Sequence, residues 1–219
     1  MPSQHHQILK VKKSKSDFYN ANIKKDSEDY KMANIALAYY RDEVGQELLM
    51  FKKENSTAIY RWLHYIEQNF DEIFQNLEVD YIVRALGSNE TSNTNQNTPL
   101  DLIGGLLAKK FNAKYVTDIL TKDRTEQLKF AGNQYNRKQI LDHKYSCDLS
   151  GLKKDATYLI IDDVTTTGTT FGEIHRTIKE ASNNQAKLHN FALVKTLWNR
   201  DYTSDKQSYN EKFYQQLIA

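Results

Sequence analysis

The sequence contains only one cysteine, Cys147, among its 219 residues. A single thiol excludes an intramolecular disulfide and any zinc site that needs several cysteines. No apolar run is long enough to span a bilayer, and the lysine-rich first fifteen residues are not followed by the apolar segment of a secretory signal. The six histidines show no metal-ligand spacing beyond the neighbours His5 and His6. These absences predict a cytoplasmic protein that contacts no membrane and holds no zinc.

The composition supports a folded core but indicates no particular class of partner. Hydrophobic residues make up 39% of the chain and charged residues 26%, with a formal net charge of +2. The length of 219 residues suits one α/β domain, alone or with an appended subdomain. This small positive charge does not require nucleic acid, and an anionic small molecule would suit it equally well.

Changes in composition divide the chain into three parts. Residues 1–31 are polar and charged and are expected to form a loosely attached arm, residues 32–200 carry the apolar segments of a folded domain, and residues 201–219 form a tail. Within the domain, two apolar segments flank Asp42–Gly45, which predicts a β-hairpin over residues 34–53.

The rest of the domain alternates between helices and strands. Residues 56–74 show apolar side chains at helical spacing, with Ser56 as the candidate cap, and further helices begin at Pro99 and Thr169. The expected strands cover residues 79–86, 115–120, 157–161 and 191–197, and polar loops cover 88–98 and 121–154. This order predicts an α/β fold with a mostly parallel, Rossmann-like sheet flanked by helices.

One segment combines a strand, two acids and a loop of small residues. The strand that ends near Ile161 is followed by Asp162 and Asp163, then by the loop Thr166–Thr170 and a helix. Backbone N–H groups and the positive end of the helix dipole would converge on such a loop, which suits a phosphate group. The segment lacks the lysine of a nucleoside-triphosphate loop and the glycine pattern of a dinucleotide site. The adjacent carboxylates suit the vicinal hydroxyls of a sugar, which are hydrogen-bond donors.

Leu159–Phe171 resembles the phosphoribosyl-pyrophosphate signature of the type I phosphoribosyltransferases, whose fold and substrate the resemblance therefore implies. Within that superfamily, residues 35–197 are most similar to ComF-like proteins, without their N-terminal zinc-binding cysteines. The resemblance implies that Asp162 and Asp163 bind the ribose 2′- and 3′-hydroxyls and are catalytic, with Mg²⁺ held nearby through ligand and water. It assigns the 5′-phosphate to Thr166, Thr167, Gly168, Thr169 and Thr170. It also implies a hood over the acceptor site, formed here by residues 34–75.

The resemblance places two further groups of residues around the leaving group. Type I enzymes hold pyrophosphate with the loop after the first sheet strand, where this chain has Arg84, Ala85, Gly87 and Ser88. The alternative for Arg84 is a strand-end arginine in solvent. Residues 121–154 stand where the family has its mobile catalytic loop, and Arg124 and Arg137 are the candidate catalytic cations there. Solvated surface charges are the alternative for both.

These residues predict binding of phosphoribosyl pyrophosphate and transfer of its phosphoribosyl group to an unidentified acceptor. Two alternatives stay open: a non-catalytic ligand sensor or scaffold in DNA uptake or processing, and a nucleotide-targeting effector of antiviral defence. Either a homodimer or a hetero-complex is compatible with the sequence. The tail segment Ser208–Ile218 could form an amphipathic helix through Tyr209, Phe213 and Leu217, docked on its own domain or on another chain.

Overall fold

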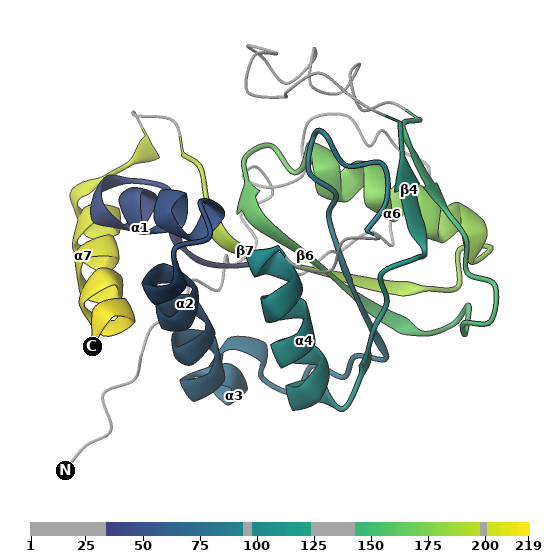
Figure 1. Ribbon diagram of the computed structural model, residues 1–219, viewed down its shortest axis with the longest axis horizontal. Coiled ribbons are helices and arrows are strands. Elements are labelled where there is room, and N and C mark those ends of the chain that lie inside the picture. Colours follow the sequence, from purple (N-terminus) through teal and green to yellow (C-terminus); the bar gives the residue numbers. More distant parts are fainter. Residues whose placement is uncertain (1–33, 94–97, 124–142, 198–200) are drawn as a thin grey trace.

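A five-stranded parallel sheet forms the centre of the protein (Figure 1). The computed structural model describes residues 34–93, 98–123, 143–197 and 201–219. The strand order is β1-β7-β6-β2-β3, and every neighbouring pair is parallel. The strands are β1 (Asn34–Tyr39), β2 (Tyr81–Arg84), β3 (Lys114–Tyr115), β6 (Thr157–Thr165) and β7 (Lys187–Lys195). The mostly parallel sheet flanked by helices that the sequence predicts is therefore confirmed.

Helices cover both faces of the sheet because its central strands are apolar on both sides. On β6, Leu159 and Ile161 face a core made with one group of helices, whereas Tyr158 and Ile160 face a second core against a single helix. The first group is α1 (Asp42–Lys52), α2 (Ser56–Gln68), α3 (Phe70–Phe74), α4 (Pro99–Phe111) and α7 (Ser204–Ile218). The second core packs on α6 (Thr169–Ala181) and on a small antiparallel sheet of β4 (Leu120–Lys122) and β5 (Tyr145–Cys147).

The predicted hairpin over residues 34–53 is wrong. Strand β1 pairs in parallel with β7, and the chain then enters α1 at Asp42. The reason lies in the spacing of the apolar residues, because Val44, Leu48 and Phe51 fall on one face of a helix and are buried. Gly45 lies inside this helix instead of supplying a turn.

Three smaller differences concern element boundaries. Asn55, and not Ser56, caps α2, since its side chain accepts a hydrogen bond from the Ala58 N–H at 3.0 Å. The strand expected over residues 115–120 is split between β3 and β4, which belong to different sheets. Strand β6 continues through the two acids to Thr165, so the carboxylates lie on a paired strand and not in a loop.

The C-terminal helix α7 docks on its own chain. Phe213 packs against Tyr65 of α2, with ring centroids 4.8 Å apart, and Leu217 is also buried. The buried Asn210 side chain accepts a hydrogen bond from the Tyr39 N–H at 3.0 Å and donates one to the Tyr39 carbonyl at 2.9 Å. An amide side chain thereby takes the place of a further strand beside β1, which fixes α7 at this edge of the sheet.

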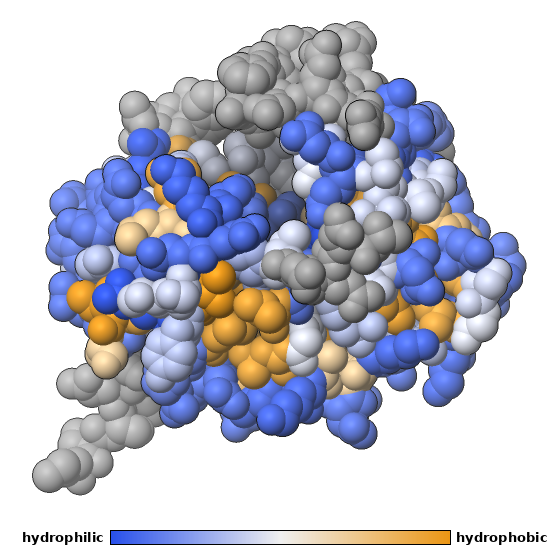
Figure 2. Space-filling view, viewed as in Figure 1, coloured by the Kyte–Doolittle hydropathy of each residue, from blue (hydrophilic) through white to orange (hydrophobic). Residues whose placement is uncertain are grey.

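The face of the molecule in Figure 2 is mostly hydrophilic. Figure 2 shows an apolar area over α4, where Leu102 is 48% exposed. None of the helices in the described part of the chain has the length and apolar character needed to cross a membrane. Residues 1–31, expected to form an arm, lie outside the described residues.

Candidate active site

The two acids of the signature lie at the carboxyl end of β6, between β2 and β7. The Asp163 N–H donates to Asp162 Oδ1 at 2.8 Å, and Lys52 Nζ of α1 lies 2.9 Å from Asp163 Oδ2. Burial raises the pKa of Asp162, and the neighbouring Asp163 charge raises it further. The pair therefore combines a lysine-paired Asp163 with an Asp162 that resists ionisation.

The threonine loop next to these acids enters α6 with the geometry of an anion site. Gly168 is the N-terminal cap of α6 and has a φ of 74°, a left-handed conformation that favours glycine. Thr167 Oγ1 and Thr169 Oγ1 lie 2.7 Å apart, and Thr166 Oγ1 donates to Thr196 Oγ1 at 3.2 Å. No acidic side chain lies in the first turn of α6, so the positive end of the helix dipole faces the loop without a carboxylate of its own.

One cavity of about 640 Å³ brings most of the predicted site residues together. Its wall includes both acids, all five residues of Thr166–Thr170, and Ala85, Gly87 and Ser88 from the loop after β2. The wall also includes the N-terminus of α4, the C-terminal end of α1, Glu90, Lys122 of β4 and Tyr145 of β5. The predicted catalytic cations Arg124 and Arg137 lie outside the described residues.

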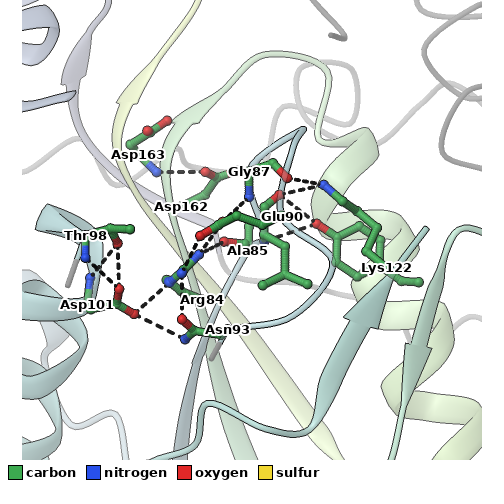
Figure 3. A network of polar contacts seen from close by, with 12 residues as sticks. Arg84, Ala85, Gly87, Glu90, Asn93, Thr98, Asp101, Lys122, Asp162 and Asp163 are labelled. Carbon is green, nitrogen blue, oxygen red and sulfur yellow. Dashed lines mark hydrogen bonds and ion pairs between the residues drawn. The ribbon is translucent and has the colours of Figure 1, made fainter. Parts of the chain in front are cut away.

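Arg84 also lines this cavity, and its side chain is held in a closed network of acceptors (Figure 3). It is 2% exposed, so the alternative of an arginine in solvent is wrong. Its Nε donates to Asp101 at 2.7 Å, and its two terminal nitrogens donate to Glu90 at 2.7 and 2.8 Å. Bonds to the Ala85 carbonyl at 3.1 Å and to Asn93 Oδ1 at 2.6 Å account for the remaining N–H groups. All five N–H groups of Arg84, the residue predicted to bind pyrophosphate, therefore already donate to acceptors of the protein itself.

The three charged groups of this network shift one another's pKa values. Burial alone would lower the pKa of Arg84, but hydrogen bonds and charge from Glu90 and Asp101 outweigh it and raise that pKa. Burial opposes ionisation of both acids, and the bonds from Arg84 and neighbouring donors reverse this and lower their pKa values. Asp101 also closes a capping box with Thr98 at the start of α4. The arginine thus joins the loop after β2 to the helix that follows it.

The backbone of the loop after β2 is held in one orientation. Tyr145 Oη accepts a hydrogen bond from the Leu86 N–H at 3.2 Å and donates one to the Leu86 carbonyl at 3.1 Å. Lys122 Nζ donates to the carbonyls of Leu86 and Gly87, and burial lowers its pKa to about 8. The Gly87 N–H points the opposite way, toward Glu90 Oε2 at 2.6 Å. The loop therefore turns its carbonyls to a lysine and an N–H group to an anion.

Glu90 and Lys52 are among the site residues that sequence reasoning missed. Glu90 is the only charged residue of the polar segment Ser88–Thr98, and that isolation was a usable signal. Lys52 belongs to a segment that carries the ComF-like resemblance, but its contact with Asp163 crosses 111 residues and has no sequence signature. No group of three or more potential metal-ligating side chains occurs among the described residues.

Comparison with known proteins gives weak structural similarity and no sequence match. No protein-family model and no curated protein matches the chain. The structure is similar to an adenine phosphoribosyltransferase at 17% identity and a TM-score of 0.42, covering 72% of this chain and 78% of that one. It is also similar to adenine phosphoribosyltransferase from Saccharomyces cerevisiae, at 15% identity and a TM-score of 0.39, covering 72% of this chain and 77% of that one. For hypoxanthine phosphoribosyltransferase from Staphylococcus aureus the identity is 13% and the TM-score 0.34, covering 74% of this chain and 68% of that one. At these TM-scores the similarity assigns neither family nor activity, and the function is inferred from the residues of the cavity.

Proposed function

We propose that the chain binds phosphoribosyl pyrophosphate in this cavity and transfers the phosphoribosyl group to an acceptor, releasing pyrophosphate. The observation that carries this proposal is the joint position of the two acids at the end of β6 and the threonine loop at the start of α6. Both line the same cavity as the loop after β2. A single ligand with a phosphate at one end and a sugar in the middle would satisfy both elements at once.

The proposed reaction exchanges one bond at C1 of the ribose. The bond from C1 to the pyrophosphate oxygen breaks, and its electron pair leaves on that oxygen. A nucleophilic atom of the acceptor forms the new bond to C1 and loses its proton to solvent or to a nearby base. The residues act mainly by positioning the sugar and by neutralising charge on the leaving group, which together account for large rate enhancements in enzymes.

The acids fit a magnesium ion bound through the ligand. Both acids line the cavity, but desolvation disfavours the charged form of Asp162 and makes it a poor direct ligand. Magnesium retains several waters, so Asp162 and Asp163 would hold it through water and ribose hydroxyls. When bound, the ion would supply positive charge to the pyrophosphate oxygens. The ion pair with Lys52 holds the Asp163 side chain in place for this role.

Titration calorimetry with magnesium phosphoribosyl pyrophosphate tests the proposal. The full chain should bind the ligand, and Asp163→Asn should weaken binding by about tenfold or more, because a charged hydrogen bond contributes about 1.5–3 kcal/mol. Asp155→Asn is the matched control, since Asp155 is exposed in the turn that precedes the opposite end of the same strand. Absence of binding by the unmodified chain, or equal affinities for all three proteins, contradicts the proposal.

Transfer itself needs a second assay. Pyrophosphate release should be measured with free purine and pyrimidine bases as acceptors, again with Asp163→Asn beside Asp155→Asn. A ligand-sensing protein that binds without transfer is the second candidate, because Glu90 already occupies donors expected to hold pyrophosphate. Binding without release for any base would favour that candidate. The ComF-like likeness, a cytoplasmic location and roles in DNA uptake or antiviral defence stay predictions from the sequence.

A further inference from the structure

The carboxylate of Glu90 occupies the subsite in which the sequence predicts that the leaving pyrophosphate binds. Two groups expected to bind pyrophosphate, the Arg84 guanidinium and the Gly87 N–H, both donate to it at 2.6 to 2.8 Å. Figure 3 shows Glu90 between Arg84 and Gly87, beside the Asp162–Asp163 pair. The same carboxylate lines the cavity. An anion is therefore already bound in this subsite, and the protein supplies it.

We propose that Glu90 is a built-in competitor of pyrophosphate, which the pyrophosphate group of the ligand displaces on binding and which returns to expel pyrophosphate after transfer. This inference rests on the proposed function, because it assigns the subsite of the leaving group. A carboxylate and a phosphate can replace each other here, because the planar guanidinium of Arg84 can donate two parallel hydrogen bonds to either group. Gly87 would likewise exchange one anionic oxygen for another.

The surroundings of Glu90 allow it to leave while Arg84 stays. The Glu90 side chain is 29% exposed and belongs to a surface turn in which Asn89 and Thr91 are exposed. Arg84 keeps Asp101 at 2.7 Å as counter-ion and Asn93 at 2.6 Å as a further acceptor. Departure of Glu90 therefore frees two N–H groups of the guanidinium without leaving a buried charge unpaired.

The receiving loop stays in place during the exchange. Lys122 and Tyr145 hold the carbonyl and N–H of Leu86 from the side opposite the Glu90 carboxylate, and neither contact involves Glu90. The Gly87 N–H thus keeps its direction when its acceptor changes. Glu90 is the mobile member of an otherwise fixed subsite, and this makes it a determinant of affinity for the leaving group.

Calorimetry with magnesium pyrophosphate on the full chain separates Glu90 from the rest of the site. Glu90→Gln removes the charge and keeps the shape, so pyrophosphate should bind about tenfold more tightly, the effect of one like charge close to the ligand after solvent screening. Ribose 5-phosphate, which lacks the pyrophosphate group, should bind the variant and the unmodified chain equally. Glu180→Gln is the matched control, because Glu180 also pairs with an arginine, at 2.5 Å, but on the last turn of α6.

Two further measurements keep the inference testable if Glu90→Gln folds poorly in thermal melts. Glu90→Ala should show the same gain, and hydrogen–deuterium exchange of residues 88–92 in the unmodified chain should rise when magnesium pyrophosphate binds. Equal pyrophosphate affinity with and without Glu90, or no pyrophosphate binding to any variant, overturns the inference. Failure of ribose 5-phosphate to bind the unmodified chain overturns the proposed function instead, and the pyrophosphate comparison still decides the role of Glu90.

Discussion

Replacing Arg84 by methionine is expected to destabilise the fold strongly. The substitution removes five hydrogen bonds and the positive charge that lies between Asp101 and Glu90. Methionine fills a similar volume, so the effect reports the loss of polar partners more than the loss of packing. Arg84 and Asp101 are 2% and 5% exposed, and water therefore compensates little at that end of the network.

The expected magnitude follows from which groups lose their partners. Breaking a buried ion pair from one side costs about 3–5 kcal/mol. Asp101 retains its bonds from Tyr115 at 2.6 Å and from Thr98 at 2.7 Å, and Glu90 can turn to solvent. Both facts favour the lower end, about 3 kcal/mol, which corresponds to a fall in Tm of roughly 6–12 °C for a protein of this size.

Urea-induced unfolding followed by circular dichroism measures this loss. Lys144→Met is the control, because Lys144 lies 3.8 Å from Asp123 in an exposed ion pair and its removal should cost less than about 1 kcal/mol. Arg84→Lys should fall between the two, since an ammonium group cannot bond to both carboxylates in fork geometry. If Arg84→Met is no less stable than Lys144→Met, the network does not stabilise the fold and the reasoning is refuted.

Three further predictions concern the edge strand, the phosphate loop and pH. Asn210→Ala should lower the unfolding free energy by about 2–4 kcal/mol, because two backbone groups of Tyr39 lose a buried partner; urea unfolding measures it. Gly168→Ala should weaken ribose 5-phosphate binding in calorimetry, since a positive φ costs a residue with a Cβ about 1–2 kcal/mol. Burial, and then Asp163, raise the pKa of Asp162, so the folded chain holds a proton that the unfolded chain releases. The stability that this bound proton contributes is fully present below about pH 4 and is lost as the pH rises through the pKa of the folded chain. Thermal melts should therefore show that Asp162→Asn loses less stability than the unmodified chain between about pH 5 and about pH 8.

The sequence predicts the parts of this protein that depend on local pattern. Helix α6 begins at the predicted residue, Thr169, because a glycine and threonines at its start and apolar residues at helical spacing all favour the same element. The alternation of Tyr158, Leu159, Ile160 and Ile161 between the two cores also follows from strand geometry. The hairpin prediction failed where two local signals competed, and burial of Val44, Leu48 and Phe51 on the sheet decided for a helix.

The polar contacts of the site depend on distances that no local pattern encodes. Arg84 meets Asp101 only because the capping box starts α4 at Pro99 and turns that carboxylate toward the sheet. Glu90 meets Gly87 through a turn of polar residues that lacks periodicity. A strand-end arginine three residues before a glycine therefore resembles a free anion site in the sequence, although in the fold Glu90 already supplies the anion.

The docking of α7 has a consequence for solubility during folding. A β1 edge without cover would present unpaired N–H and carbonyl groups to any other extended chain, which is a common route to aggregation. Asn210 blocks the groups of Tyr39, and Tyr209 Oη donates to the Leu37 carbonyl at 2.7 Å on the same edge. Because this cover comes from the last helix in the sequence, the edge of β1 stays uncovered until the C-terminal residues have folded onto it. Slow or incomplete docking of α7 would therefore expose the parallel sheet to strand pairing between molecules.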